Sequence, residues 1–178
     1  MTTQSSNSIS DERNFRPKTL EDFIGQGDLK KTLRLMLDSA HQRSATLEHV
    51  VFYGGPGLGK TTLAAIIAAE QAARFHELAA PSIQKPGDLA SILVMLQEGD
   101  VLFLDECHAM RREMAELLYS AMEDFKISIK PEGGERLITM GLKPFTLVGA
   151  TTDFGLLPGR CAPASGKGSI FSPIRWLS

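Results

Sequence analysis

Cysteine is scarce in this sequence, and any sign of a membrane or secretion segment is lacking. The 178 residues hold two cysteines, Cys107 and Cys161. Neither stands in a CxxC or metal-ligand spacing, which argues against a disulfide scaffold or a zinc site and fits a reducing cytoplasm. No apolar run approaches the ~20 residues that a membrane helix needs. Residues 1–14 are polar, lack the apolar region of a secretion signal and are expected to form a flexible tail.

An excess of basic charge is lacking as well. Lysine and arginine together number 19 against 21 acidic residues, and the net charge is −2. This stretch therefore has no electrostatic footprint of a nucleic-acid binder by itself. Its hydrophobic fraction of 43% is ordinary for a globular protein, and its length suffices for one α/β domain with a core of its own.

Hydrophobic patterning predicts strands that alternate with helices. Strands are expected over residues 49–53, 101–104 and 145–150, and helices over 60–73, 88–96, 112–122 and a segment capped by Asp28. Alternation of this kind predicts a three-layer α/β domain, in which a parallel sheet is covered on both faces. Residues 126–142 alternate around Gly133-Gly134 and predict an inserted β-hairpin that projects from the domain.

A phosphate-binding loop follows the first predicted strand. Residues 54–61 read GGPGLGKT, which matches G-x-x-x-x-G-K-[ST] between a strand and a helix. Glycines allow backbone N–H groups to surround phosphate oxygens, and the helix N-terminus adds unpaired donors. Lys60 would reach the β- and γ-phosphates and the Thr61 hydroxyl would bind Mg²⁺. The alternative, a glycine-rich surface turn, does not explain the strand and the helix on either side.

Two acidic residues end the second predicted strand. An apolar run leads directly into Asp105 and Glu106, and carboxylates at the end of a buried strand need water, a cation or a partner. In a P-loop protein the first acid holds Mg²⁺ and the second polarises the attacking water. A strand that simply runs out into solvent is the alternative, and the phosphate loop upstream disfavours it.

The residues after this acidic pair read Cys107-His108, so the motif also matches the DExH box of another helicase class. That class needs an upstream glutamine motif and a second arginine-bearing domain, which we do not find. We expect His108 to contact neighbouring elements rather than a metal. The third predicted strand ends at Thr151-Thr152. A hydroxyl there can bind the γ-phosphate, or the threonines can simply reflect strand propensity, and the residues alone do not decide.

Taken together, these residues resemble the RuvB family of hexameric AAA+ motor ATPases. The resemblance covers about residues 15–158 and includes RPKTLEDFIGQ, GPGLGKTTLA, GDVLFLDECH, AMEDF and PFTLVGATTDFG. It implies ATP and Mg²⁺ as ligands, self-association into hexameric rings, Holliday junction DNA as substrate in recombination and repair, and RuvA as a partner that docks on the 126–142 hairpin.

The resemblance also implies roles for individual residues. Glu106, Asp105 and Thr152 would act in catalysis, with Thr152 as the sensor, and Thr61 and Asp105 would lie at the metal. The nucleotide would be bound by Phe15, Arg16, Gly57, Leu58, Gly59, Lys60, Thr61, Thr62, Glu123, Asp124 and Phe125. Three positions depart from the family pattern, with Gly55 in place of Pro, Cys107 in place of Ile and Asp153 in place of Arg.

The family pattern fails after Pro158. The arginine-finger stretch, the helical lid and the winged helix are not recognisable in residues 159–178, which we expect to form an aberrant or unstructured tail. A frameshift at this point is one interpretation, and a natural short variant is the other. We therefore expect the chain to bind ATP·Mg²⁺ weakly and to hydrolyse it at or near background.

The sequence thus predicts the ATP-binding core of a cytoplasmic branch-migration helicase subunit. Two alternatives remain. The same residues could form a non-catalytic nucleotide-binding or assembly module, which ATP turnover would distinguish. Another AAA+ ATPase, such as a clamp-loader subunit, is disfavoured by the hairpin and by the AMEDF segment.

Overall fold

A parallel sheet forms the centre of the molecule. The computed structural model describes residues 17–130, 136–153 and 170–171, the last pair by backbone alone. Within them the sheet order is β2-β3-β6-β1-β7. The first four strands run parallel: β1 (Val50–Tyr53), β2 (Phe75–Ala79), β3 (Val101–Asp105) and β6 (Thr146–Thr151). The carboxyl ends of β1, β6 and β3 therefore lie side by side at one edge, where α/β proteins bind their ligands.

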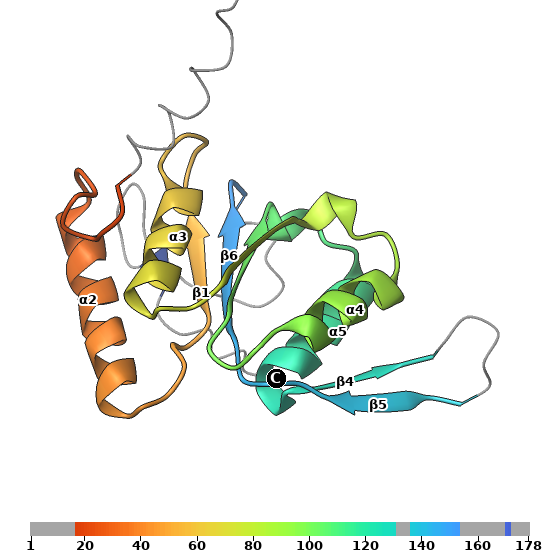
Figure 1. Cartoon of the computed structure of the whole chain (residues 1–178). Coiled ribbons are helices and arrows are strands. Elements are labelled where there is room, and N and C mark those ends of the chain that lie inside the picture. The colour runs from red at the N-terminus through yellow and green to blue at the C-terminus, as the bar shows by residue number, and fades with distance from the viewer. Residues whose placement is uncertain (1–16, 131–135, 154–169, 172–178) are drawn as a thin grey trace, which may run out of the picture.

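Helices cover both faces of this sheet (Figure 1). On one side lie α2 (Gly27–Gln42) and α3 (Lys60–Glu70), and on the other α4 (Pro86–Met95) and α5 (Arg112–Asp124). Successive residues of each strand face opposite layers. Thus Val101 and Phe103 pack with α2 and α3, whereas Leu102 and Leu104 pack with α4 and α5. The predicted three-layer architecture is confirmed. None of the described helices is long and apolar enough to span a bilayer.

The structure corrects the sequence prediction at three elements. The edge strand β2 is not predicted, because its alternating exposed side chains give no apolar run. Asp28 does not cap α2, which begins at Gly27 after Gln26. In the segment 159–178, where no regular structure is expected, Ile170–Phe171 (β7) pair antiparallel with β1. Two short 3₁₀ turns, Ala80–Ser82 and Cys107–Ala109, are also new.

The predicted hairpin is present and projects from the α5 side of the domain (Figure 1). It consists of β4 (Lys126–Ile129) and β5 (Ile138–Gly141), paired antiparallel with Ile129 opposite Ile138. Ile127 at its base is fully buried, whereas Ile138 is 48% exposed. The apolar face of the hairpin is therefore anchored in the core at its base and exposed further along. Its turn at Gly133-Gly134 lies outside the described residues.

His49 joins three elements at the edge of the sheet where the strands begin. Its Nδ1 accepts the Leu147 N–H at 2.9 Å, so its Nε2 carries the proton and donates to Met122 O at 3.3 Å. The ring also packs against Phe125 and Phe145. The hydrogen bond from Leu147 requires the neutral ring, and burial lowers the pKa of His49 below its ordinary value.

A loss of stability below about pH 6.5 follows from this lowered pKa. Between these two pKa values the unfolded chain is protonated at His49 and the folded chain is not. The free energy of unfolding therefore falls as pH falls from about 6.5 towards the folded pKa, by up to about 1.4 kcal/mol per pH unit. Urea unfolding at pH 7.5 and 5.5 measures this slope. We expect His49→Gln to reduce it and His41→Gln, at an exposed position of α2, to leave it intact. Equal slopes in all three proteins would contradict the assignment.

Candidate functional site

The phosphate loop joins β1 to α3 at the carboxyl edge of the sheet. Gly59 precedes the helix with a φ of 79°, in the left-handed region that favours glycine. A Cβ on Gly59 would lie 2.8 Å from the Phe23 ring, which packs against the loop from the N-terminal segment. A side chain at Gly59 would therefore both strain the backbone and displace the Phe23 ring.

Lys60 is the first residue of α3, and its ammonium group lies over the loop. Its Nζ donates to Gly54 O at 2.8 Å and to Gly55 O at 3.0 Å. The first N–H groups of α3 have no partner within the helix, and the positive end of the helix dipole lies there. Lys60 and the helix N-terminus thus place positive charge at the loop, which suits a bound phosphate.

The acidic pair lies at the end of β3, two strands away from the loop. Asp105 Oδ1 accepts the Glu106 N–H at 3.0 Å. Glu106 itself has φ 49° and ψ 45°, a left-handed conformation that costs a residue with a side chain about 1 kcal/mol or more. Strain of this kind is common at functional sites, and here it turns the chain so that the Glu106 carboxylate points back towards β6.

The end of β6 lies between the phosphate loop and the acidic pair. Thr152 Oγ1 donates to Glu106 Oε2 at 3.1 Å, and the Gly54 N–H donates to Thr151 O at 3.2 Å. Two hydrogen bonds therefore connect the three strand ends. The structure brings together Lys60, Glu106 and Thr152, which the sequence places far apart.

A divalent cation fits the residues predicted to hold it. The Thr61 hydroxyl lies in the first turn of α3, and Asp105 is half-exposed at the end of β3. Hydroxyl and carboxylate oxygens are the ligands that Mg²⁺ prefers, and the ion usually takes only one or two protein carboxylates beside phosphate and water. The described residues contain no cluster of three or more His, Cys, Asp or Glu side chains that could hold a metal.

The two residues after the acidic pair contact β6. Burial raises the pKa of the Cys107 thiol to about 12, so it is protonated and unreactive at neutral pH. A Cβ on Gly149 would lie 3.4 Å from Cys107 Sγ, which shows how closely the thiol approaches β6. His108 Nδ1 lies 2.8 Å from Thr151 Oγ1 and 3.2 Å from Glu106 Oε2. The prediction that His108 contacts neighbouring elements is confirmed.

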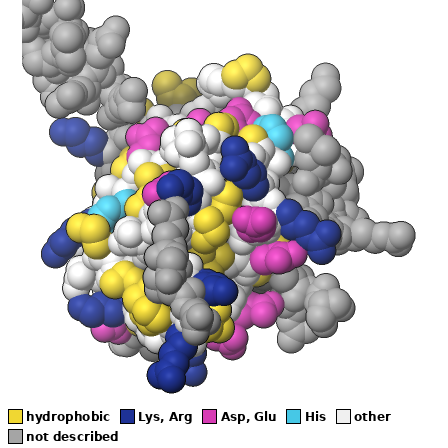
Figure 2. Space-filling model, turned by 90° about the vertical axis from the view of Figure 1, so that its right-hand side faces the viewer, with side chains coloured by type: hydrophobic (Ala, Val, Ile, Leu, Met, Phe, Trp, Pro, Cys, Tyr) yellow, Lys and Arg dark blue, Asp and Glu magenta, His cyan; other side chains and the backbone are white. Residues whose placement is uncertain are grey.

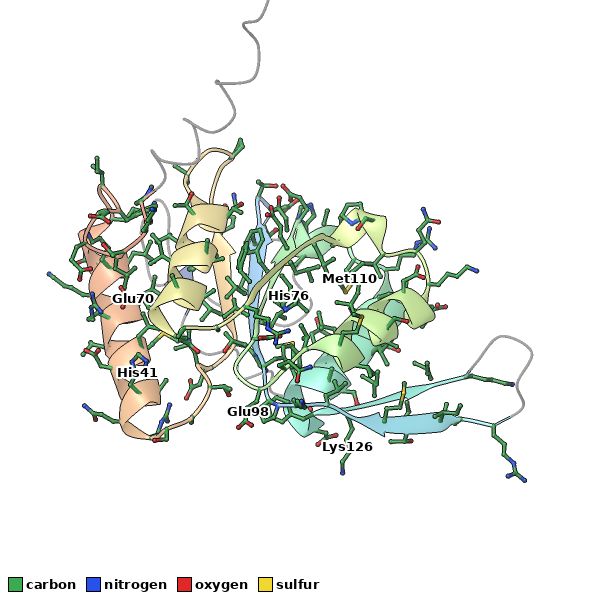
Figure 3. The ribbon with its side chains drawn as sticks, viewed as in Figure 1. His41, Glu70, His76, Glu98, Met110 and Lys126 are labelled. Carbon is green, nitrogen blue, oxygen red and sulfur yellow. The ribbon has the colours of Figure 1, made fainter. Side chains whose placement is uncertain are left out.

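The segment Glu123-Asp124-Phe125 and the phosphate loop lie at opposite edges of the sheet. The resemblance assigns both to the nucleotide, but within this chain they do not form one site. The Phe125 ring packs against His49 at the beginning of β1, whereas the loop follows the other end of that strand. Five residues of strand span about 16 Å. Figure 3 shows Lys126, the residue after this segment, at the lower end of the domain, where the hairpin begins. Residues 123–125 therefore lie at the edge of the sheet opposite the phosphate loop.

The remaining predicted residues divide into two groups. Phe15 and Arg16 lie outside the described residues. Six others form the loop and the first turn of α3: Gly57, Leu58, Gly59, Lys60, Thr61 and Thr62. Sequence reasoning missed Phe23 and the structural part played by Thr151. The sequence signal for Phe23 was the apolar stripe in residues 16–26, which predicts packing without naming the surface that it covers.

Comparison with known proteins agrees with this geometry. Residues 15–165 match the family model described as the Holliday junction DNA helicase RuvB P-loop domain. The Holliday junction branch migration complex subunit RuvB of Ehrlichia ruminantium (strain Gardel) is 49% identical over 158 residues, which cover 86% of this chain and 48% of the relative. The Streptomyces griseus subunit of the same name is 54% identical over 149 residues, 83% of this chain and 41% of the relative.

Solved structures give the same result. The Thermotoga maritima RuvB Holliday junction branch migration motor superposes with a TM-score of 0.70 at 49% identity, over 81% of this chain and 44% of that one. The chain spans about half the length of the curated relatives that it matches. The matched residues contain the phosphate loop, the acidic pair and the end of β6, so the site lies within the part that is shared. The chain belongs to the family of the Holliday junction DNA helicase RuvB P-loop domain.

Proposed function

We propose that this chain is the ATP-binding core of a subunit that moves Holliday junctions along DNA in recombination and repair. The observation that carries the proposal is that three strand ends meet, which brings Lys60, Glu106 and Thr152 to one edge of the sheet. Thr152 donates to Glu106, and the Gly54 N–H of the phosphate loop donates to Thr151 O. ATP would bind with its phosphates on the loop and the N-terminus of α3. Thr61 and Asp105 would hold Mg²⁺, which neutralises phosphate charge when bound.

Glu106 would act as the general base towards the attacking water. Its side chain is 37% exposed, so a water molecule can reach the carboxylate. Thr152 would sense the γ-phosphate through the same carboxylate. For Glu123, Asp124 and Phe125 we propose contact with a nucleotide held by the neighbouring subunit of a ring, because the phosphate loop of their own chain lies at the opposite edge. Phe15 and Arg16 would flank the adenine, and the compartment would be the cytoplasm.

Turnover tests the motor proposal. Residues 15–158 would be joined to the C-terminal half of the Streptomyces griseus relative, and ATP hydrolysis measured with and without RuvA and four-way junction DNA. Stimulation by both supports a branch-migration motor. A chimera that binds ATP without turnover would support the non-catalytic module. Stimulation by a sliding clamp and primed DNA in place of the junction would support a clamp loader.

The hairpin is the proposed docking site for RuvA. Its exposed apolar residues, Leu137 at 64% and Ile138 at 48%, extend outward from the domain, and exposed apolar side chains of this kind mark binding surfaces. Figure 2 looks onto the face from which the hairpin projects and shows hydrophobic side chains exposed among charged ones. On the face of the hairpin opposite Ile138, the Ser128 and Thr139 hydroxyls lie 2.8 Å apart.

Ile138→Asp is therefore expected to weaken RuvA binding by at least ~30-fold, on the order of 2 kcal/mol, because a charge replaces an apolar interface anchor. Biolayer interferometry on immobilised RuvA measures this with the chain itself. Thr139→Asp is the matched control, since it adds the same charge to the other face of the same strand and should change affinity little. ATP affinity should remain unchanged in both. Wild-type affinity of Ile138→Asp for RuvA would refute the docking site.

A further inference from the structure

Two side chains contact the same carboxylate oxygen of Glu106. Thr152 Oγ1 lies 3.1 Å from Oε2, and His108 Nδ1 lies 3.2 Å from the same atom. Within the described part of the chain, no hydrogen bond or ion pair is found at Oε1. One oxygen is thus fixed by two protein groups, while the other remains available to solvent.

Thr151 determines which nitrogen of His108 carries the proton. The Thr151 hydroxyl donates to Asp153 O at 2.9 Å and accepts the Asp153 N–H at 3.0 Å. With its proton on this carbonyl, the Thr151 hydroxyl can only accept at the 2.8 Å contact to His108 Nδ1, and Nδ1 is then the donor. A carboxylate oxygen 3.2 Å away also demands a donor. Both neighbours thus favour a proton on His108 Nδ1, with Thr151 Oγ1 at 2.8 Å and Glu106 Oε2 at 3.2 Å.

Thr151 also fixes His108 relative to the phosphate loop. Its carbonyl accepts the Gly54 N–H at 3.2 Å, at the first residue of that loop. The Thr151 side chain is fully buried, and the His108 side chain is only 18% exposed. A short series of contacts, from Gly54 through Thr151 and His108 to Glu106, thus sets the carboxylate position against the loop where phosphate would bind.

We propose that His108 is a positioning residue for Glu106, an inference that rests on the proposed function. Its Nδ1–H and the Thr152 hydroxyl hold Oε2, so that Oε1 faces the attacking water. In ATP hydrolysis, the water oxygen forms a bond to the γ-phosphorus, and the bond from the γ-phosphorus to the β,γ-bridging oxygen breaks. ADP leaves with that electron pair, and the water proton goes to Oε1. His108 does not exchange a proton in this step.

The backbone around His108 supports this assignment. The left-handed turn at Glu106 and the 3₁₀ turn Cys107–Ala109 direct the histidine back over the sheet. Cys107 anchors the turn against Gly149 on β6. A histidine needed only to fill space would not require two oxygen acceptors at one nitrogen, because an apolar side chain of similar size would pack there without desolvating a donor.

The tautomer is the first test, and it needs no turnover. Long-range ¹H–¹⁵N spectra of the 178-residue chain at pH 8 distinguish the two neutral forms, and His108→Asn assigns the signal by removing it. We expect the Nδ1–H form, which is the minor one in free histidine. An Nε2–H tautomer, with Nδ1 as acceptor, would overturn the proposal because Nδ1 could not then hold the Glu106 carboxylate.

The second test separates kcat from KM in the chimera with the C-terminal half of the relative. His108→Ala should lower kcat by on the order of 10- to 100-fold with KM little changed, because the base is misplaced while ATP binding is intact. His108→Asn should restore most of the rate, since its amide nitrogen lies near the position of Nδ1. A wild-type kcat in His108→Ala would refute the positioning role and leave the proposed function standing. A loss of kcat that His108→Asn does not restore would do the same. A wild-type chimera without turnover refutes the proposed function and the role with it.

Discussion

Lys60→Ala is expected to lower the affinity of the chain for ATP by at least ~100-fold. A hydrogen bond to a charged group contributes roughly 1.5–3 kcal/mol, and Lys60 can make more than one to the β- and γ-phosphates. In the structure its ammonium group donates to the Gly54 and Gly55 carbonyls. When ATP binds, the ammonium group would give up these two hydrogen bonds and donate to phosphate oxygens instead. The wild-type affinity for ATP already includes the cost of losing the two hydrogen bonds.

Isothermal titration of the chain with Mg·ATP measures the change. Lys126→Ala, at an exposed position at the base of the hairpin (Figure 3), removes the same charge at the opposite edge of the sheet and is the matched control. Lys60→Arg keeps the charge but replaces a point-like ammonium by a planar fork, and should recover only part of the affinity. Wild-type affinity in Lys60→Ala, with an unchanged circular dichroism spectrum, would show that ATP does not bind at this loop.

The core of the sheet could be predicted from sequence because burial on both faces leaves a simple signal. The strand β3 is apolar and buried from Val101 to Leu104, and all six residues of β6 are buried. The edge strand β2 carries His76 and Glu77 and is half-exposed, so it resembles a loop in sequence. An edge strand needs pairing on one side only, and its partner is fixed by tertiary structure rather than by local pattern.

The chemical motifs of the site were predicted, but the contacts between them were not. A strand that ends in acids and a loop that cradles phosphate are local features. The hydrogen bond from Thr152 to Glu106 joins residues 46 positions apart and depends on the order in which β3 and β6 lie in the sheet. The contact of Phe23 with Gly59 likewise depends on how the N-terminal segment crosses α3.

The segment 123–125 illustrates a different limit. Resemblance assigns a motif to a nucleotide but does not say which subunit holds that nucleotide. Here Phe125 lies beside His49 and Phe145 at the beginning of the strands, whereas Lys60 and Glu106 lie where the strands end. A single sequence contains no information on the neighbouring subunit, so only the three-dimensional arrangement separates the two edges.

Glu106 allows binding and chemistry to be separated, because an amide can keep the contacts that its carboxylate makes with Thr152 and His108. In Glu106→Gln the side-chain oxygen can still accept from Thr152 and His108, which now contact Oε2 at 3.1 and 3.2 Å. The other position becomes an NH₂ group, which cannot take a proton from water. General-base catalysis contributes about 10²–10⁴ in rate, so turnover of the chimera with the relative's C-terminal half should fall on the order of 10³-fold.

ATP affinity, in contrast, should change by less than about threefold in Glu106→Gln, since removing one negative charge near a polyphosphate does not weaken its binding. Titration of the chain with Mg·ATP and single-turnover hydrolysis by the chimera measure the two quantities separately. Glu113→Gln, in the exposed first turn of α5, is the matched control and should leave both unchanged. Equal hydrolysis by Glu106→Gln and wild type would exclude Glu106 as the base. A parallel loss of ATP affinity would instead show that the carboxylate acts through the metal, as Asp105 is expected to do.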